Sequence, residues 1–224
     1  MRDIVAIDGP AGAGKSTIAR RVAEALGFAF LDTGAMYRAA TWWAMHEGIN
    51  LDDPAALEKA TSEMDLDLQE DGGITRVCVK GHDVSDAIRT PEVTRNIHKL
   101  DRSPGVRALL VELQRATGSR GPTVAEGRDI GTVVFPKAKC KVYLDASIEE
   151  RARRRAEEFT RKGLAVDIAE VRADIRTRDE KDMTRAVAPL RRADDAHVID
   201  TTHMTPQEAV DAIVALARSA WSGR

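Results

Sequence analysis

The chain has 224 residues, enough for one large domain or for one core with inserted subdomains. Its net charge of −2 and pI of about 6.2 argue against a broad nucleic-acid-binding surface, and its longest apolar run, Ala212 to Ala217, is too short for a membrane span. The N-terminal residues lead directly into a strand pattern, so no signal peptide is predicted. Cys78 and Cys140 have no metal-ligand spacing and are expected to be buried reduced thiols, which is typical of a cytoplasmic protein.

The first motif is a phosphate-binding loop. Residues 9–17 read Gly-Pro-Ala-Gly-Ala-Gly-Lys-Ser-Thr and fit the pattern G-x-x-x-x-G-K-[ST], between a predicted buried strand at 3–8 and a predicted helix at 18–26. In such a loop the backbone N–H groups surround a phosphate, Lys15 contacts the β- and γ-phosphates, and the Ser16 hydroxyl is the expected Mg²⁺ ligand. The sequence therefore predicts a nucleoside triphosphate site formed by Gly9, Pro10, Ala11, Gly12, Ala13, Gly14, Lys15, Ser16 and Thr17.

A second candidate site follows the next strand. Residues 28–31 predict a buried strand, and the helix after it begins within Asp32-Thr-Gly-Ala-Met-Tyr-Arg38. Ligands of open parallel sheets bind beyond the carboxyl ends of the strands, which makes Thr33, Tyr37 and Arg38 candidate substrate residues. The alternative for Arg38 is a solvated helix position.

The pattern then changes to an antiparallel insert at roughly 63–90. Apolar residues alternate at 66–68 and at 77–79, with predicted turns at 71–73 and at 81–83. Helix-start signals occur at three places, namely Asp53-Pro54, Thr90-Pro91 and Pro104. Residues 63–120 are therefore predicted to form a subdomain inserted between the second and third parallel strands.

The third parallel strand, at 123–125, leads into Glu126-Gly-Arg-Asp-Ile-Gly131. An Arg–Asp pair in a glycine-containing loop at the carboxyl end of a strand is a candidate functional position, and the alternative is a surface salt bridge. Residues 141–145 and 197–200 predict the last two strands. The final helix starts with a capping box at 205–208 and carries an apolar stripe typical of a core helix.

Basic residues cluster on the helix predicted after Ser147. Arg151, Arg154 and Arg155 lie at i, i+3 and i+4 and so share one face. They fit either a solvated basic face paired with neighbouring glutamates, or a lid that closes over phosphates, for which the planar guanidinium is well suited. Further on, Arg178, Asp182 and Arg185 are spaced i, i+4 and i+7 and are expected to face one cleft, before residues 187–190 break the helix.

Together these motifs resemble the bacterial cytidylate kinase family over nearly the whole chain. The phosphate loop is shared by many NTPases, whereas Gly127-Arg-Asp-Ile-Gly131 and Arg185-Ala-Val-Ala-Pro189 are much more specific. The resemblance implies an α/β, three-layer P-loop fold with a five-stranded parallel sheet, a small antiparallel sheet in an inserted subdomain, and a helical lid. The implied boundaries are a core at 1–32, 121–147 and 186–224, a monophosphate-binding region at 33–120 with its antiparallel insert at about 63–102, and a lid at about 148–185.

The resemblance also implies the activity, an ATP-dependent phosphorylation of CMP and dCMP in pyrimidine metabolism with Mg²⁺, by a monomer without nucleic-acid or membrane partners. Its implied catalytic residues are Lys15, Arg128, Arg154, Arg155 and Arg178. Its implied CMP-binding residues are Thr33, Tyr37, Arg38, Arg107, Arg128, Asp129, Arg178, Asp182 and Arg185. Two positions depart from the family, since Thr33 replaces a frequent serine and His98 stands where some members have a base-contacting serine.

Three questions stay open at the level of sequence. Glu126 and Asp129 are equally suited to support the metal through its waters. A kinase of another small acceptor, such as UMP, AMP or an alcohol, is the second enzyme interpretation. A nucleotide-dependent switch is the alternative from another class, although the basic helix has no role in a simple switch.

Overall fold

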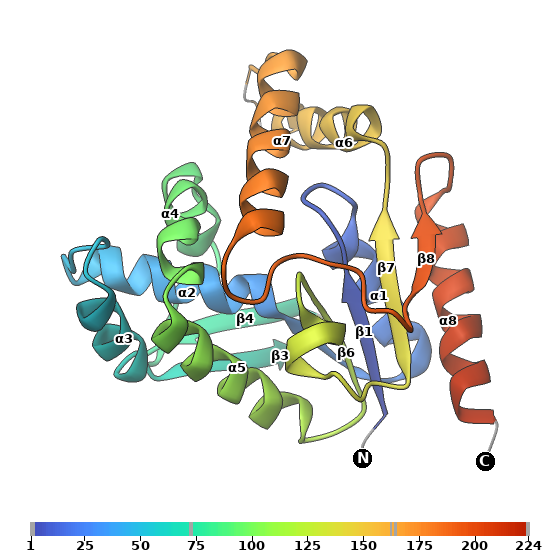
Figure 1. Cartoon of the computed structure of the whole chain (residues 1–224), viewed down its shortest axis with the longest axis horizontal. Coiled ribbons are helices and arrows are strands. Elements are labelled where there is room, and N and C mark those ends of the chain that lie inside the picture. The colour runs from blue at the N-terminus through green and yellow to red at the C-terminus, as the bar shows by residue number, and fades with distance from the viewer. Residues whose placement is uncertain (1–2, 72–73, 162, 164, 223–224) are drawn as a thin grey trace. The chain divides into compact units, whose positions relative to one another are not determined.

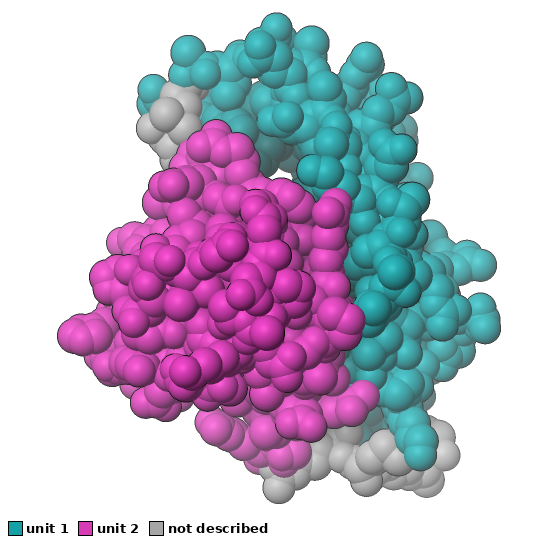
Figure 2. All heavy atoms as spheres, turned by 60° about the vertical axis from the view of Figure 1, so that its left-hand side comes forward, with its two compact units in different colours: residues 1–30, 121–224 teal, residues 31–120 magenta. Residues whose placement is uncertain are grey.

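The computed structural model describes residues 3–71, 74–161, 163 and 165–222. The chain divides into two compact units, which Figure 2 colours separately. Residues 1–30 and 121–224 form the first, here called the core unit, and residues 31–120 form the second, the inserted unit. The finer division into core, monophosphate-binding region and lid stays a prediction.

The main sheet has five strands in the order β2-β6-β1-β7-β8 (Figure 1). These strands are β1 (Ile4–Asp8), β2 (Ala29–Asp32), β6 (Thr123–Gly127), β7 (Cys140–Asp145) and β8 (His197–Asp200). β1 runs parallel to β6 and β7, and β7 runs parallel to β8. The predicted α/β fold with a parallel five-stranded sheet is confirmed. In this register Asp8 pairs with Gly127 and Tyr143, so the carboxyl ends of three neighbouring strands lie together.

One face of the sheet is covered by α1 (Lys15–Leu26) and α8 (Pro206–Ser222). Apolar residues of both helices share a core with the strands, namely Ile18, Val22, Val210 and Ile213 with Val5, Ile7, Val142 and Leu144. Each such buried side chain contributes about 1.5–3 kcal/mol. The predicted capping box at the start of α8 is confirmed, since Thr205 N–H donates to Glu208 Oε2 at 2.8 Å and Glu208 N–H donates back to Thr205 Oγ1 at 3.3 Å.

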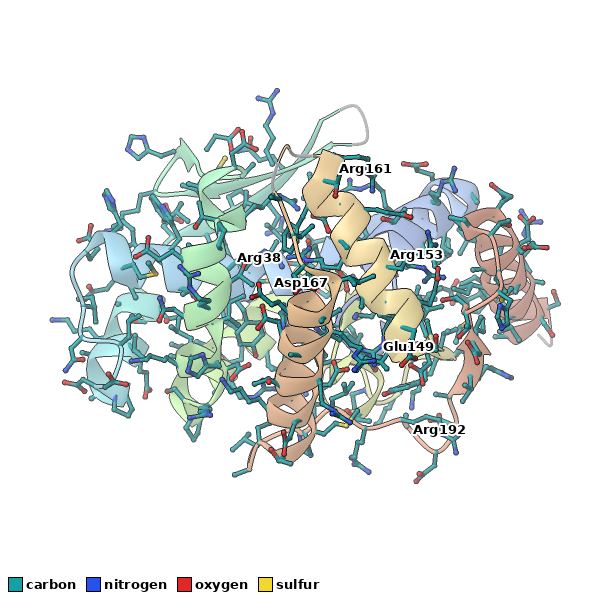
Figure 3. The ribbon with its side chains drawn as sticks, turned by 90° about the horizontal axis from the view of Figure 1, so that it is seen from above. Arg38, Glu149, Arg153, Arg161, Asp167 and Arg192 are labelled. Atoms are coloured by element: carbon teal, nitrogen blue, oxygen red, sulfur yellow. The ribbon has the colours of Figure 1, made fainter. Side chains whose placement is uncertain are left out.

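The basic helix is α6 (Ile148–Arg161), and it pairs with α7 (Ile168–Thr184). Figure 1 shows both helices beyond the carboxyl ends of β1 and β7, and in the view from above Glu149, Arg153 and Arg161 follow α6 while Asp167 lies at the start of α7 (Figure 3). A small apolar cluster of Ala152, Val171 and Ile175 joins the two helices. The two helices thus form a pair with a small apolar core of its own, and the role of this pair as a lid stays a prediction.

The inserted unit combines helices with a small antiparallel sheet. Its helices are α2 (Thr33–His46), α3 (Pro54–Ser62), the 3₁₀ turn η1 (Ala87–Arg89), α4 (Pro91–Asp101) and α5 (Pro104–Gly118). Its strands are β3 (Leu66–Asp71), β4 (Ile74–Val79) and β5 (His82–Asp83), in that order. The predicted helix starts are confirmed, because Asp53 and Thr90 accept N–H groups of the first turns that follow them.

The prediction of a turn at 81–83 was wrong at two positions. His82 and Asp83 form a short strand, and the turn is made by Lys80 and Gly81, which both have positive φ angles, 49° and 79°. A two-residue hairpin turn requires this backbone geometry, so the chain reverses one residue earlier than predicted. The turn predicted at 71–73 includes Gly72 and Gly73, which lie outside the described residues.

Both cysteines match their prediction, since Cys78 and Cys140 are free and buried. Burial raises the pKa of the Cys140 thiol to about 11, which makes it a poor nucleophile. Within the described residues, no helix combines the length and the apolar character that crossing a membrane would demand.

Candidate active site

The phosphate loop connects β1 to α1 in the core unit, and two of its glycines are required by the backbone. A Cβ added to Gly9 would lie 2.0 Å from the carbonyl oxygen of Leu144. Gly14 precedes α1 with a φ of +85°, a left-handed conformation that favours glycine. The loop therefore lies close against β7 and enters α1 at its positive end, a geometry suited to binding an anion.

Lys15, the first residue of α1, is buried. Only 6% of the residue is exposed, and its Nζ donates to the carbonyl oxygen of Pro10 at 2.7 Å. Burial, together with the nearby charges of Arg128 and Arg178, lowers the pKa of Lys15 to about 7. An anionic phosphate would oppose this shift by placing a further negative charge beside the ammonium group.

Ser16 contacts Glu126, one of the two carboxylates considered for the metal. The Ser16 hydroxyl donates to Oε1 of Glu126, a residue of β6, at 2.5 Å. No cluster of three or more His, Cys, Asp or Glu side chains suited to a metal occurs in the part of the chain that the structure describes. A hydroxyl beside one carboxylate fits Mg²⁺, which takes few protein oxygens and completes its shell with water and phosphate.

Asp8, the last residue of β1, holds the start of the segment that follows β6. Its Oδ1 accepts the N–H of Ile130 at 2.7 Å and its Oδ2 accepts the N–H of Gly131 at 2.8 Å. Burial raises the pKa of Asp8 to about 6, against the effect of these two hydrogen bonds. Ile130 and Gly131 come directly after Arg128 and Asp129 in the chain. Asp8 therefore holds the backbone on the C-terminal side of that Arg–Asp pair.

Arg128 makes a buried ion pair with α7. Its Nε lies 2.7 Å from Asp182 Oδ2, and the two side chains are 18% and 10% exposed. Burial acts to lower the pKa of Arg128, but the charge and hydrogen bond of Asp182, together with the charges of Glu126 and Asp179, raise it. Burial alone would raise the pKa of Asp182, but Arg128, together with Arg178 and Arg185, lowers it, so both groups stay charged. The surface salt bridge considered as the alternative for Arg128 does not describe this pair.

Asp129 lies beside Arg185, whose predicted position on a helix face was wrong. The Arg185 Nη2 is 3.4 Å from Asp129 Oδ1, and Arg185 Nε donates to the carbonyl oxygen of Ala188 at 2.6 Å. Arg185 has extended backbone angles, since α7 stops at Thr184. It therefore approaches Asp129 from the segment after α7 rather than by the i+7 spacing from Arg178 that the sequence suggested.

Four of the five arginines of α6 lie close together in the sequence, and each has a different environment. Arg151 is buried against the phosphate loop and Asp179, whereas Arg153 is exposed and pairs with Glu150 and Glu157 as expected of a solvated face. Arg154 donates to Glu150 at 2.7 Å and to the Thr201 carbonyl oxygen at 2.6 Å. Arg155 pairs with Glu158 and lies over the ring of Phe159. The solvated basic face considered for Arg151, Arg154 and Arg155 therefore does not describe Arg151, which is buried.

In the inserted unit, Asp32 organises the predicted substrate residues. Its side chain accepts the N–H of Ala35 at 2.7 Å as the N-cap of α2, and it also pairs with Arg38 at 3.0 Å. The Arg38 Nε is buried and has no hydrogen-bond acceptor among the described residues. Arg107 is buried with its guanidinium 5.7 Å from the ring centre of Tyr37. These contacts bring Tyr37, Arg38 and their helix cap together, and Thr33 is buried at the start of the same helix.

His98, which departs from the family pattern, contacts its own helix. Its Nδ1 lies 2.7 Å from the carbonyl oxygen of Arg95, one turn earlier on α4. This local contact satisfies one ring nitrogen without a ligand.

The sequence did not identify two buried acidic residues of the core unit, Asp8 and Asp179. A carboxylate at the last position of an otherwise apolar strand was a usable signal for Asp8. Asp179 gave no such signal, because its partners Ala11 and Arg151 lie 168 and 28 residues away in the chain.

The chain is similar in sequence to one family and to long curated relatives. The family model described as "Cytidylate kinase" matches residues 5–219. A "Bifunctional pantoate ligase/cytidylate kinase" from Synechocystis sp. is 51% identical over 216 residues, and one from Synechococcus elongatus is 49% identical over 222 residues. The matches cover 95% and 97% of this chain but 42% of each relative, so the chain spans about two fifths of the length of these relatives.

Among solved structures, the chain is similar to a sugar kinase from Janibacter sp. HTCC2649. The TM-score is 0.50 with 16% sequence identity, and the match covers 97% of this chain and 95% of that one. At this identity the similarity concerns the fold alone.

Proposed function

Because this chain belongs to the cytidylate kinase family, we propose that it transfers the γ-phosphoryl group of ATP to CMP or dCMP and forms CDP or dCDP. The observation that carries the proposal is the pairing of β1 with β6, which sets Asp8 beside Gly127. The phosphate loop and the Arg128–Asp129 loop therefore start from adjacent strand ends. Phosphoryl transfer needs a donor and an acceptor phosphate held in line, and two neighbouring anion-binding loops suit that requirement.

In this proposal the nucleophile is a phosphate oxygen of CMP. It is already anionic, so no general base is required, and the enzyme acts by positioning the two phosphates and neutralising their charge. Lys15 would leave the Pro10 carbonyl for the triphosphate, and the bound phosphate would keep it protonated. Mg²⁺, when bound, neutralises charge on the β- and γ-phosphates, and Ser16 and Glu126 are the residues that would hold it.

Arginines that bind the acceptor phosphate are the second part of the proposal. Arg128 would keep its position through Asp182 while its remaining N–H groups bind the acceptor phosphate. In the inserted unit, the buried and unsatisfied Nε of Arg38 supports the same role. Arg178 and Asp182 would contact the sugar, and Arg178 would also contact phosphate. Arg154 and Arg155 would exchange their present glutamate partners for phosphate when the lid closes, which also excludes water.

The base would be read by Asp129, Arg185 and Arg107, with Thr33 and Tyr37 as further contacts. Cytosine carries an amino donor at C4 and an acceptor at N3, where uracil has a carbonyl and an N–H. A carboxylate and arginines supply the complementary acceptor and donors. Both Asp129 and Arg185 are largely buried, so a mismatched base would leave buried polar groups unpaired.

A coupled assay that follows ADP formation tests the proposal, with ATP, Mg²⁺ and a panel of CMP, dCMP, UMP, AMP and a small alcohol. We expect the highest kcat/KM with CMP or dCMP, a lower one with UMP, and little activity with AMP or the alcohol. The highest kcat/KM with AMP or the alcohol would contradict the assignment of the acceptor. ADP formation that no acceptor accelerates would favour an ATPase or a switch instead.

A further inference from the structure

We propose that Arg151 and Asp179 are positioning residues that hold the Ala11 peptide of the phosphate loop and connect it to both helices of the lid. Neither residue is among those assigned above to ATP or CMP. The inference rests on the proposed function, since it concerns how the phosphate loop and the helix pair act in the same transfer reaction.

The two side chains together occupy both backbone groups of Ala11. Asp179 Oδ1 accepts the Ala11 N–H at 3.0 Å, and Arg151 Nη1 donates to the Ala11 carbonyl oxygen at 2.9 Å. Arg151 Nη1 also pairs with Asp179 Oδ2, and Arg151 Nε donates to the carbonyl oxygen of Ala146 at 3.0 Å. With its N–H already bonded, Ala11 is not expected to contribute that group to a bound phosphate, unlike other residues of the loop.

The arrangement is buried and closely packed. Each of the two side chains is 9% exposed. A Cβ added to Gly12 would lie 3.2 Å from the Cβ of Arg151 and 3.3 Å from its carbonyl oxygen, so the loop backbone rests directly on α6. Ala152 and Ile175 belong to the apolar cluster between the two helices, next to this contact. A shift of the loop is therefore transmitted to the first turn of α6 and to α7.

The chemistry of the pair favours positioning over stability. A buried ion pair is often no more stabilising than apolar residues of similar volume, because burying two charges offsets most of their attraction. The hydrogen bonds to Ala11 are directional, and apolar side chains cannot replace them. Apolar replacement of the pair should thus preserve the fold and still release the loop.

The experiment compares three variants of the full chain with wild type. The first, Arg151→Met with Asp179→Leu, removes the charges and the bonds to Ala11 together. The second, Asp179→Asn, keeps an oxygen for the Ala11 N–H but leaves Arg151 without a counter-charge. The matched control, Glu149→Gln with Arg172→Gln, removes the exposed α6–α7 pair whose atoms lie 3.9 Å apart.

We measure Tm, the Kd for ATP by calorimetric titration without acceptor, and kcat with KM for each substrate. For the apolar double variant we expect a folded protein with a lower Tm, since the buried Ala11 N–H loses its acceptor, a Kd for ATP at least about fivefold weaker, and kcat at least about tenfold lower. The KM for CMP should change less than about twofold, because the phosphate loop binds the donor. For Asp179→Asn we expect a lower Tm with a Kd for ATP within about threefold of wild type. The control should match wild type throughout.

A folded apolar double variant with wild-type Kd and kcat would overturn the inference and leave the pair as a purely structural contact. If that variant does not fold, the Asp179→Asn variant tests the inference instead. A Kd for ATP that weakens in proportion to the loss of Tm in this variant would also overturn the inference. The ATP titration needs no acceptor. A wild-type chain that binds ATP but does not phosphorylate CMP would therefore refute the proposed function, while the inference about the loop would still be tested by the Kd values.

Discussion

Asp8→Asn is the substitution whose effect follows most directly from the structure. Asp8 is buried, and both carboxylate oxygens accept backbone N–H groups at the start of the segment after Asp129. The asparagine keeps one acceptor and turns an NH₂ group toward the other N–H. One unsatisfied buried N–H costs about 1–3 kcal/mol, whereas removing the buried charge is favourable.

The sign and size of the charge effect come from the pKa of Asp8, which is raised from 3.8 to about 6. Between these values the folded state retains a proton that the unfolded state has released, so this contribution to stability decreases as pH rises through the window. The full effect is about 3 kcal/mol, of which roughly 1.5 kcal/mol develops between about pH 5 and about pH 7.5. The free energy of unfolding of Asp8→Asn, measured relative to that of wild type, should therefore rise by about 1.5 kcal/mol over that range.

Urea unfolding of the nucleotide-free protein at both pH values measures this difference, and subtracting wild type removes the contribution of groups that titrate equally in both proteins. Asp53→Asn is the matched control. Asp53 also accepts two backbone N–H groups but at the exposed start of α3, where asparagine is an equally good cap. A wild-type-to-variant difference that does not depend on pH, or that moves in the opposite direction, would refute the reasoning about Asp8.

Three further substitutions test the proposed roles in catalysis. Lys15→Ala should lower kcat about 100-fold or more with an unchanged circular dichroism spectrum, and near-normal kcat would reject the phosphate-loop assignment. The double substitution of Arg154 and Arg155 by Ala should lower kcat more than it raises the KM for CMP, and Arg153→Ala, on the exposed side, should have little effect. Asp129→Ala should reduce kcat/KM for CMP more than for UMP, and the change in the ratio of the two values should correspond to about 1–3 kcal/mol. An equal loss with both substrates would assign Asp129 to phosphate or metal.

Much of the fold was predictable because its signals are local. Strand β1 is a short apolar run directly before the phosphate loop, and the caps of α3 and α8 can be read from four consecutive residues. The error at His82 and Asp83 has a local cause as well. The sequence identified the glycine of the turn but did not show that Lys80, with its positive φ, is the other turn residue.

The candidate site was predictable only in part, because its contacts join distant segments. Arg128 and Asp129 could be identified as candidates because they follow a strand. Their partners Asp182 and Arg185 could not, because they lie 54 and 56 residues away in the chain. Arg151 shows that sequence spacing can also group residues whose environments differ. Its spacing grouped it with Arg154 and Arg155, and only burial against Ala11 and Asp179 separates it from them.

A product analysis distinguishes phosphoryl transfer to CMP from simple hydrolysis of ATP. The protein is incubated with ATP, Mg²⁺ and CMP, and the nucleotides are separated by ion-exchange chromatography. We expect ADP and CDP to form in equal amounts. The formation of both should require CMP and should be lost in Lys15→Ala. ADP without CDP, or CDP formation that survives the loss of Lys15, would contradict this expectation.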